Sequence, residues 1–190
     1  MIRWLVAKKV KVHIGCGTLY KEGWVNIDNN SDNNIARLDI NHDLATGLPF
    51  ANDEVDFIYH EHFIEHLTYE DGLIFMQECF RVLKPSGVMR IACPDLDILI
   101  DSYTNNTWRE QEWVTKYGCE WIESRCHMLN VCMTYWGHKF IYNKEELNKR
   151  LIQAGFDAIH ISEQKYCQSS YKELQNLDTR VDSMFFDVKK

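Results

Sequence analysis

Val12-His13-Ile14-Gly15-Cys16-Gly17-Thr18 is the stretch of this chain from which the fold can be predicted. Its first three residues are typical of a buried strand, and a glycine turn follows them directly. Gly15 and Gly17 flank a single residue, so the backbone can turn sharply there and a ligand can approach it without meeting a Cβ. Short Gly-x-Gly turns also occur by chance, so the rest of the chain has to support this interpretation.

A carboxylate follows the glycine turn at a spacing that fits a nucleoside site. The run Trp24-Val25-Asn26-Ile27 is typical of a second strand, and Asp28 stands at its end. A strand, a glycine turn, a second strand and a carboxylate are the parts of a nucleoside-binding crevice in an open α/β sheet. A dinucleotide fingerprint would have another glycine where this chain has Tyr20, and its acid would come about 20 residues on. Both differences argue against a nicotinamide or flavin enzyme.

Strand and helix patterns alternate along the remainder of the chain. The segment 18–23 is too short for the helix that usually joins parallel strands, so a loop or a single helical turn is expected there. Apolar patterns predict further strands over 35–40, 55–59, 88–93, 156–162 and 184–188, and amphipathic helices over 63–83 and 144–154, the second capped by Asn143. This alternation predicts an α/β fold with a mainly parallel sheet that is covered on both faces.

Aromatic residues concentrate between residues 95 and 137, where the alternation of strands and helices stops. Residues 97–103 are expected to be helical, and Trp113, Tyr117 and Trp121 recur at the spacing of one helix face. One interpretation is a helical lid that packs a small core of its own, since aromatic stripes usually become buried. The other is that several of these rings line a substrate pocket, and both can hold for different residues.

Length, charge and cysteine content limit the function classes open to this chain. At 190 residues it is most simply one domain, and its formal net charge of −7 argues against non-specific nucleic-acid binding. No apolar run approaches the roughly 20 residues that span a bilayer, and residues 1–10 are too short for a secretory signal, so we expect a cytoplasmic protein without membrane contact. The seven cysteines form no Cys-x-x-Cys pair, which favours reduced thiols. Cys119, Cys126, His127 and Cys132 lie close in sequence, but their gaps fit no common zinc pattern, so no metal is expected.

Several motifs follow one another along the chain in a recognisable order. They are Ile14-Gly15-Cys16-Gly17, Asp28 after a strand, Asp43 ahead of Leu48-Pro49-Phe50, Asp56-Phe57-Ile58-Tyr59, Ile64-Glu65-His66-Leu67 and Arg81-Val82-Leu83-Lys84-Pro85-Ser86-Gly87. As a set they resemble the class I S-adenosylmethionine-dependent methyltransferases, in particular the type 11 group that acts on small molecules and sugars. The tail of the chain agrees, with 138–140, 154–156 and 178–180 placed as in such domains.

The resemblance implies a Rossmann-like, doubly wound fold with a seven-stranded, mostly parallel sheet. The strand order would be 3-2-1-4-5-7-6, with the last strand antiparallel. The chain would form a single methyltransferase domain over residues 1–190, with a small aromatic-rich helical lid inserted at about 95–137. The implied cofactor is S-adenosyl-L-methionine.

The resemblance also assigns roles to single residues. Asp28 would accept hydrogen bonds from both ribose hydroxyls, and Asp43 would accept one from the adenine amino group, although turn capping is the alternative for either. His60 would lie beside the sulfonium, whereas His13 departs from the pattern, because the family commonly has an acid there that helps to place the methionine end. The implied cofactor-binding residues are His13, Gly15, Cys16, Gly17, Asp28, Asn29, Asp43, Leu44 and His60.

Three residues are candidates for the catalytic base. Methyl transfer is a displacement in which alignment supplies much of the rate, and a hydroxyl acceptor additionally benefits from a base. Glu65 and His66 stand where related oxygen methyltransferases can carry their base, and His138 lies between the lid and the last helix. Packing or capping is the alternative for each histidine. The run 62–66 also matches the His-x-x-Glu-His pattern of metalloproteases, but its place between a strand and a helix disfavours that interpretation.

The sequence therefore predicts an enzyme that methylates a small molecule or a sugar at oxygen, with no nucleic-acid partner. The aromatic lid motivates the sugar, because aromatic rings pack well against the apolar face of a pyranose, and polysaccharide modification would be the corresponding process. A non-catalytic S-adenosylmethionine-binding module with the same fold is the alternative, motivated by His13. A zinc hydrolase is a third interpretation, which would require stoichiometric zinc.

Overall fold

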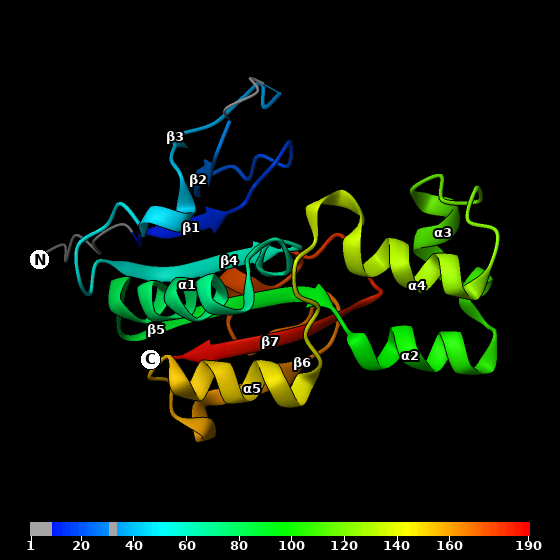
Figure 1. The fold of residues 1–190 in the computed structure, drawn as a ribbon. Helices are drawn as coiled ribbons and strands as arrows, with labels where there is room; N and C mark the ends of the chain where they lie inside the picture. Colours follow the sequence, from blue (N-terminus) through cyan, green and yellow to red (C-terminus); the bar gives the residue numbers. More distant parts are fainter. Residues whose placement is uncertain (1–8, 31–33) are drawn as a thin grey trace, which may run out of the picture.

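The computed structural model describes residues 9–30 and 34–190, in which seven strands form one sheet (Figure 1). The strands are β1 (Lys11–Ile14), β2 (Val25–Asp28), β3 (Ile40–Asn41), β4 (Val55–Glu61), β5 (Leu83–Pro94), β6 (Ile161–Gln164) and β7 (Ser183–Lys189). Their order is β3-β2-β1-β4-β5-β7-β6, with β1 to β5 parallel and β7 antiparallel to both of its neighbours. The predicted order and the antiparallel last strand are confirmed. Most of the segment considered for a leader, residues 1–8, lies outside the described residues.

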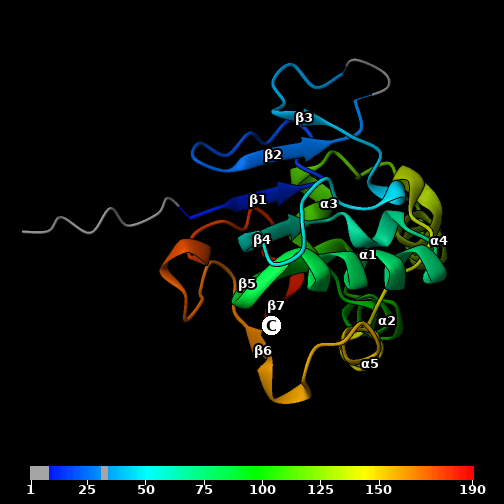
Figure 2. The same cartoon turned by 90° about the vertical axis from the view of Figure 1, so that its left-hand side faces the viewer.

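The two faces of the sheet are covered in different ways. On one face, α1 (Tyr69–Val82) and α5 (Lys144–Gln153) lie side by side, as Figures 1 and 2 show. The other face is covered by the largely irregular segment 165–182, which includes the 3-10 turn η6 (Lys172–Leu174). Leu174 packs there against Phe57 and Tyr59 of β4. Residues 88–93 of β5 are consequently all buried, as is typical of a parallel strand with both sides covered.

A buried arginine fixes the segment 165–182 to the sheet. Arg90 of β5 is completely buried, and its guanidinium donates to Asp178 Oδ1 at 2.7 Å, Asp187 Oδ1 at 3.0 Å and the carbonyl of Gln168 at 2.9 Å. Asp178 and Gln168 belong to the segment, whereas Asp187 belongs to β7. Because buried charges need partners of opposite charge, this network holds the irregular segment and the strand together.

Each of the two covering helices begins at a side-chain N-cap, of which the sequence predicted only that of α5. Thr68 Oγ1 accepts from the backbone N–H of Asp71 at 3.1 Å, and α1 starts one residue after Thr68. Asn143 Oδ1 accepts from the backbone N–H of Glu146 at 2.9 Å, which confirms Asn143 as the N-cap of α5. The start of the first helix was predicted too early. Ile64–His66 forms a separate 3-10 turn, η2, because the cap at Thr68 starts a new helix.

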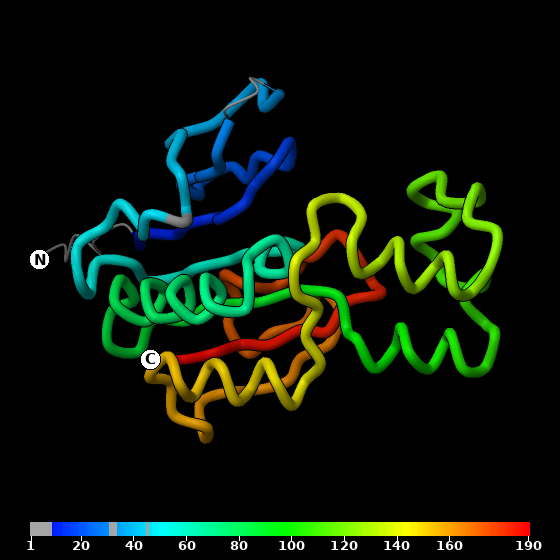
Figure 3. Tube along the Cα trace, in the orientation of Figure 1, coloured from blue at the N-terminus to red at the C-terminus, as the bar shows by residue number. Residues whose placement is uncertain are grey.

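Residues 96–137, called the lid below, lie at the carboxyl end of the sheet (Figure 3). The lid consists of α2 (Leu96–Asn105), η3 (Trp108–Glu110), α3 (Glu112–Lys116), α4 (Arg125–Thr134) and η4 (Tyr135–Gly137). It packs a core of its own, which confirms that part of the prediction. The buried members of this core are Leu99, Trp108, Trp113, Val114, Cys119, Ile122, Met128, Val131, Cys132 and, just beyond the lid, Ile141.

Three predicted elements differ from the structure. The lid aromatics expected on one helix face do not share a helix, because α3 ends at Lys116 and Gly118 adopts a φ of +65°, so Trp121 follows outside it. The strand expected over 156–162 forms only from Ile161, since the 3-10 turn η5 (Ala158–His160) precedes it. The third strand is limited to the two residues of β3.

The connection between β1 and β2 is short, as are the helices of the described residues. Between β1 and β2 the residues 18–24 form the loop that the sequence predicts, because they are too few for a crossover helix. The longest helix, α1, has 14 residues. Across the ranges 9–30 and 34–190, no helix combines the length and the apolarity that crossing a membrane requires.

Candidate cofactor and acceptor site

The glycine turn lies where β1 ends, beside the carboxyl ends of β2 and β4. Gly15 and Gly17 both have a positive φ, of +61° and +50°, which favours glycine over other residues. A Cβ on Gly15 would lie 2.4 Å from Cδ2 of Phe63, so the ring of Phe63 requires glycine there. A Cβ on Gly17 would meet no atom within 4 Å. The turn is therefore packed at Gly15 and open to a ligand at Gly17.

Asp28 at the end of β2 is tied to this turn. Its Oδ2 accepts from the backbone N–H of Gly17 at 2.7 Å, and its Oδ1 accepts from the backbone N–H of Asn29 at 2.7 Å. A carboxylate offers about four lone-pair sites, so both oxygens keep capacity for two further hydroxyl donors. Asp28 is only half-buried, which leaves this edge accessible. These features fit a ribose.

The residues expected around an adenine ring follow β3. The backbone N–H of His42 donates to the carbonyl of Asp28 at 3.0 Å, which brings the next residues, Asp43 and Leu44, to the same edge of the sheet. The carbonyl of Asp43 accepts from the backbone N–H of Thr46 at 3.0 Å, and this contact starts the 3-10 turn η1 (Leu44–Thr46). The side chain of Leu44 is buried in the main core.

Cys16, between the two glycines, is buried. Burial, and after it the charge of Asp28, raises the pKa of the Cys16 thiol to about 11. The thiol is therefore neutral at physiological pH and acts as packing, because only a thiolate would be a nucleophile.

The side chain of His13 lies on the opposite face of the sheet from that of its neighbour Ile14, because side chains alternate along a strand. It has a hydrogen-bond partner on that face. Its Nδ1 lies 3.1 Å from Asn26 Oδ1, and its ring packs against Tyr59 with 5.1 Å between centroids. Asn26 Oδ1 also accepts from the backbone N–H of Lys21 at 2.8 Å. His13 thus supports the loop that follows Gly17, and any effect on a cofactor passes through that loop.

His60 lies beneath the glycine turn, paired with Ile14 in the sheet register. It is completely buried, and within the described part of the chain neither ring nitrogen has a hydrogen-bond partner. Its ring meets Phe63 and Phe75 edge to face, with centroids 6.2 Å and 5.3 Å away. Burial lowers the pKa of His60 to about 4, so the ring is neutral. Buried polar atoms without hydrogen-bond partners are uncommon, and a bound polar ligand would supply a partner for the His60 ring.

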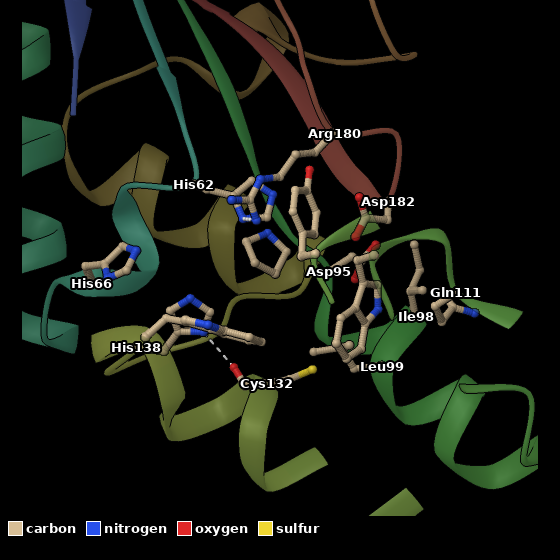
Figure 4. A pocket seen from close by; sticks show the side chains of 14 residues that line it. His62, His66, Asp95, Ile98, Leu99, Gln111, Cys132, His138, Arg180 and Asp182 are labelled. Carbon is tan, nitrogen blue, oxygen red and sulfur yellow. Dashed lines mark hydrogen bonds between the residues drawn. The ribbon is translucent and has the colours of Figure 1, made fainter. Parts of the chain in front are cut away.

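A cavity of about 310 Å³ lies between the lid and the ends of β4 and β5 (Figure 4). This volume is at the lower end of the range for small-molecule sites. Its wall combines aromatic rings, acids, an arginine and three histidines. The lining residues are His62, His66, Pro94, Asp95, Ile98, Leu99, Gln111, Trp113, Tyr117, Cys132, Trp136, His138, Arg180 and Asp182.

Two of the cavity's histidines face each other, His66 from η2 and His138 from the end of the lid (Figure 4). Their ring centroids are 5.0 Å apart. Nδ1 of His138 lies 2.7 Å from the carbonyl oxygen of Cys132, and because a carbonyl only accepts, this nitrogen carries the proton. Nε2 of His138 therefore presents a lone pair. Burial is the main cause that lowers the pKa of His66, which biases the ring of His66 toward the neutral form.

Glu65 lies behind these two rings. One donor atom from each of Glu65, His66 and His138 can be chosen so that all three lie within 4.8 Å of one another. The backbone N–H groups of Lys139 and Phe140 donate to the carbonyl of Glu65 at 2.8 Å and 3.2 Å, which holds the end of the lid against η2. The Glu65 side chain is 1 % exposed.

His62 connects Glu65 to the opposite wall of the cavity. It has a φ of +49°, an uncommon conformation for a non-glycine residue that marks a constrained position. Its Nε2 lies 2.8 Å from Ser183 Oγ, while Nδ1 faces both Arg180 Nη1 at 3.2 Å and Glu65 Oε1 at 3.1 Å. The guanidinium of Arg180 in turn stacks over Tyr117, 4.6 Å from the ring centroid.

Comparison with known proteins supports a single family. Residues 16–91 match the sequence profile of the Methyltransf_11 family, described as a methyltransferase domain. A curated relative from Mycolicibacterium smegmatis, named as a probable S-adenosylmethionine-dependent methyltransferase, is 41% identical over 59 residues, which is 31% of this chain. Residues 16–91 therefore belong to a methyltransferase domain of the S-adenosylmethionine-dependent class. The match covers 22% of the length of that relative.

Solved methyltransferases share the fold across nearly the whole chain. A SAM-dependent methyltransferase from Archaeoglobus fulgidus aligns with a TM-score of 0.61 and 16% identity, covering 97% of this chain and 87% of its own. One from Mesorhizobium loti aligns with a TM-score of 0.59 and 15% identity, covering 96% and 91%. At such identities the likeness concerns the fold. The cofactor of the family is S-adenosylmethionine.

The structure assembles the predicted site residues into two groups. The glycine turn, Asp28 and His60 meet at the ends of β1, β2 and β4. The three base candidates lie close together, with His66 and His138 in the cavity wall and Glu65 behind them. The sequence analysis did not assign a role to His62, Arg180 or Asp182, which line the cavity. His62 stands in the His-x-x-Glu-His run and Arg180 ends the motif 178–180, so the sequence offered a reason to consider each of them as a site residue. Asp182 had none.

Proposed function

We propose that this domain transfers a methyl group from S-adenosylmethionine to a hydroxyl group of a small molecule held in the lid cavity. The observation that carries the proposal is the adjacency of two sites. The cofactor motifs end at β1, β2 and β4, and the cavity with the imidazole pair begins at the next residues after β4, with His62. A methyl donor and an acceptor placed on either side of this junction would be aligned for direct transfer.

The residues present fit the cofactor. Open space over Gly17 admits a ligand close to the backbone, and Asp28 keeps hydrogen-bonding capacity for two ribose hydroxyls. Asp43 and Leu44 would contact the adenine, and the unpartnered nitrogens of His60 lie beneath the turn. A structural neighbour with a TM-score of 0.56 and 14% identity, PigF, was solved with SAH, which supports a bound adenosyl ligand in this fold.

A sugar is the acceptor class that the cavity favours. Trp113 and Trp136 offer aromatic faces, and their rings meet edge to face with centroids 6.4 Å apart. Asp95 and Asp182 supply carboxylate oxygens on another part of the wall. Flat apolar rings pack against the apolar face of a pyranose, while carboxylates accept from its hydroxyls. Residues of a polysaccharide would present the same groups, so we extend the proposal to glycan acceptors.

The base candidates are arranged to remove the hydroxyl proton. When bound, S-adenosylmethionine supplies an electrophilic methyl group, and an acceptor oxygen that bonds to it must lose its proton. Nε2 of His138 presents a lone pair toward that task, because its Nδ1 is held by the carbonyl of Cys132. His66 packs beside it, and the anionic Glu65 would stabilise the imidazolium that results. The proton thus moves from the acceptor hydroxyl to His138.

Calorimetry and a transfer assay test this proposal together. We expect S-adenosylhomocysteine to bind with one site per chain, and radiolabelled methyl groups to pass to members of a panel of monosaccharides and oligosaccharides. His138→Gln should retain cofactor binding and lose most of the transfer, whereas His160→Gln, at an exposed histidine outside the site, should keep both. Binding without transfer to any acceptor would support the non-catalytic module instead. Absence of binding would refute the proposal.

A further inference from the structure

We propose that Glu65, His66 and His138 form a binding site for a divalent transition-metal ion at the inner end of the lid cavity. One donor atom from each of these side chains can be chosen so that all lie within 4.8 Å of one another. Two imidazoles and one carboxylate at such separations can converge on a single ion with little adjustment. Binding of the ion does not depend on the proposed methyl transfer.

The orientation of His138 is that of a metal ligand. Histidines that bind metals generally donate their other ring N–H to a carbonyl, a carboxylate or water, which fixes the tautomer and directs the free lone pair. His138 donates from Nδ1 to the carbonyl of Cys132 at 2.7 Å, so Nε2 is available (Figure 4). The ring of His66 lies against the same end of the lid, because a Cβ on Gly137 would be 3.6 Å from His66 Nδ1.

Glu65 supplies the independent observation that points to a ligand. Its carboxylate is buried, and among the described residues neither oxygen has a hydrogen-bond donor with acceptable geometry. The nearest polar atom is His62 Nδ1, 3.1 Å from Oε1, but Arg180 Nη1 lies 3.2 Å from the same nitrogen. If Arg180 donates an N–H to Nδ1 of His62, that nitrogen must carry a lone pair. Nδ1 of His62 then has no proton to donate to Glu65. A buried carboxylate left in this state is costly, and a bound cation would compensate it.

The donor set selects the class of ion. Imidazole nitrogens with one carboxylate suit Zn²⁺, Mn²⁺, Fe²⁺ and Co²⁺, whereas Mg²⁺ and Ca²⁺ prefer sites made of oxygen alone. Because His66 and His138 both line the cavity, the remaining coordination positions would face its interior. The sequence analysis predicted no metal, since His138 is far along the chain from Glu65 and His66 and only the fold joins η2 to the end of the lid.

The ion would also change how an acceptor is activated, and this consequence rests on the proposed function. A hydroxyl that binds the ion from the cavity would have its pKa lowered, as metal-bound water does. His138 would then be a ligand, and the ion would replace its imidazole as the group that favours ionisation of the hydroxyl, with the proton passing to water in the cavity. Glu65 would be neutralised by the ion rather than by a protonated imidazole.

Titration of the full-length chain with Co²⁺ tests the inference without measuring activity. We expect one saturable site by calorimetry, with visible ligand-field bands and no thiolate charge-transfer band. His66→Gln and His138→Gln should each weaken binding at least ten-fold, with Glu65→Gln as a third variant. Both histidines are half-buried, so their variants should fold, and thermal unfolding checks this.

A matched control addresses adventitious binding. Cys126 is an exposed thiol next to His127 and is the natural competitor for a soft ion. The double variant Cys126→Ser/His127→Gln should leave the cobalt affinity unchanged. If that variant abolishes binding, if the three ligand variants bind as well as the parent, or if the parent shows no saturable site, the inference is wrong. S-adenosylhomocysteine binding measured in the same samples separates this result from a failure of the proposed function.

Discussion

Two glycines in the same turn have separable roles at the scale of single residues. Gly15→Ala would place a Cβ 2.4 Å from the ring of Phe63, in addition to the strain of its positive φ. We expect it to lower the free energy of unfolding by about 2–4 kcal/mol. Gly17→Ala meets no neighbouring atom and should cost only about 1–2 kcal/mol.

Among variants that remain folded, cofactor affinity should fall more in Gly17→Ala than in Gly15→Ala, which is the opposite of their order in lost stability. The Cβ of Gly17→Ala would occupy the open space over the backbone, so we expect weaker binding of S-adenosylhomocysteine by calorimetry, with a smaller loss of stability than in Gly15→Ala. Urea denaturation of both variants gives the stabilities. Equal destabilisation by the two substitutions, or parental cofactor affinity in Gly17→Ala, would contradict these assignments.

The buried histidines predict how stability depends on pH. Burial lowers the pKa of both His13 and His60 from 6.5 to about 4. Between these values the unfolded chain takes up protons that the folded chain does not, so the free energy of unfolding should fall as the pH drops from 6.5 toward 4, by up to about 3 kcal/mol for each histidine. His60→Leu should flatten this decline in urea denaturation at pH 5 and 7.5, whereas His160→Leu, at an exposed histidine, should not. An unchanged slope in His60→Leu would refute the assignment.

At the scale of elements, we expect the hydrogen bonds of Arg90 to hold the irregular segment 165–182 against the sheet. Arg90→Met would leave Asp178 and Asp187 buried without their cation, which is expected to cost about 3–5 kcal/mol of unfolding free energy. The matched control is Lys144→Met, which removes a surface pair with Glu163 and should cost less than about 1 kcal/mol. Thermal unfolding of both variants measures the difference, and similar losses would show that the buried network does not hold the segment.

Elements with local signals were predictable, and elements that depend on distant contacts were not. The N-cap of α5 at Asn143 follows from local sequence, because the cap bonds to a residue three positions on. The lid aromatics shared a helical spacing, yet the glycine at position 118 interrupts it and the lid core forms across several short helices. The strand expected over 156–162 was shortened because Asp157 accepts from the backbone N–H of Ile159 and forms a turn instead.

At the scale of the whole molecule, the two halves of the site differed in how far they could be predicted. The spacing between the glycine turn and Asp28 along the chain predicted that they lie together. In the structure the backbone N–H of Gly17 donates to the carboxylate of Asp28. The base candidates Glu65 and His138 were named separately, but nothing in their spacing indicated that Lys139 and Phe140 would bond to the carbonyl of Glu65 and close the group. Asp182 joins the cavity only through the fold and so could not be found from the sequence.

The cavity between the lid and the sheet predicts that Trp136 contacts the acceptor and that Trp121 does not. Trp136 lines the cavity and packs near His138, with 5.7 Å between ring centroids, whereas Trp121 does not line it, although both residues are 47% exposed. We expect Trp136→Ala to raise the KM for the acceptor about ten-fold, which corresponds to about 1.4 kcal/mol, with unchanged affinity for S-adenosylhomocysteine. Trp121→Ala should change neither quantity. Since both residues belong to the same lid, a similar rise in KM for Trp121→Ala would mean that the lid acts through its overall stability rather than through the cavity wall.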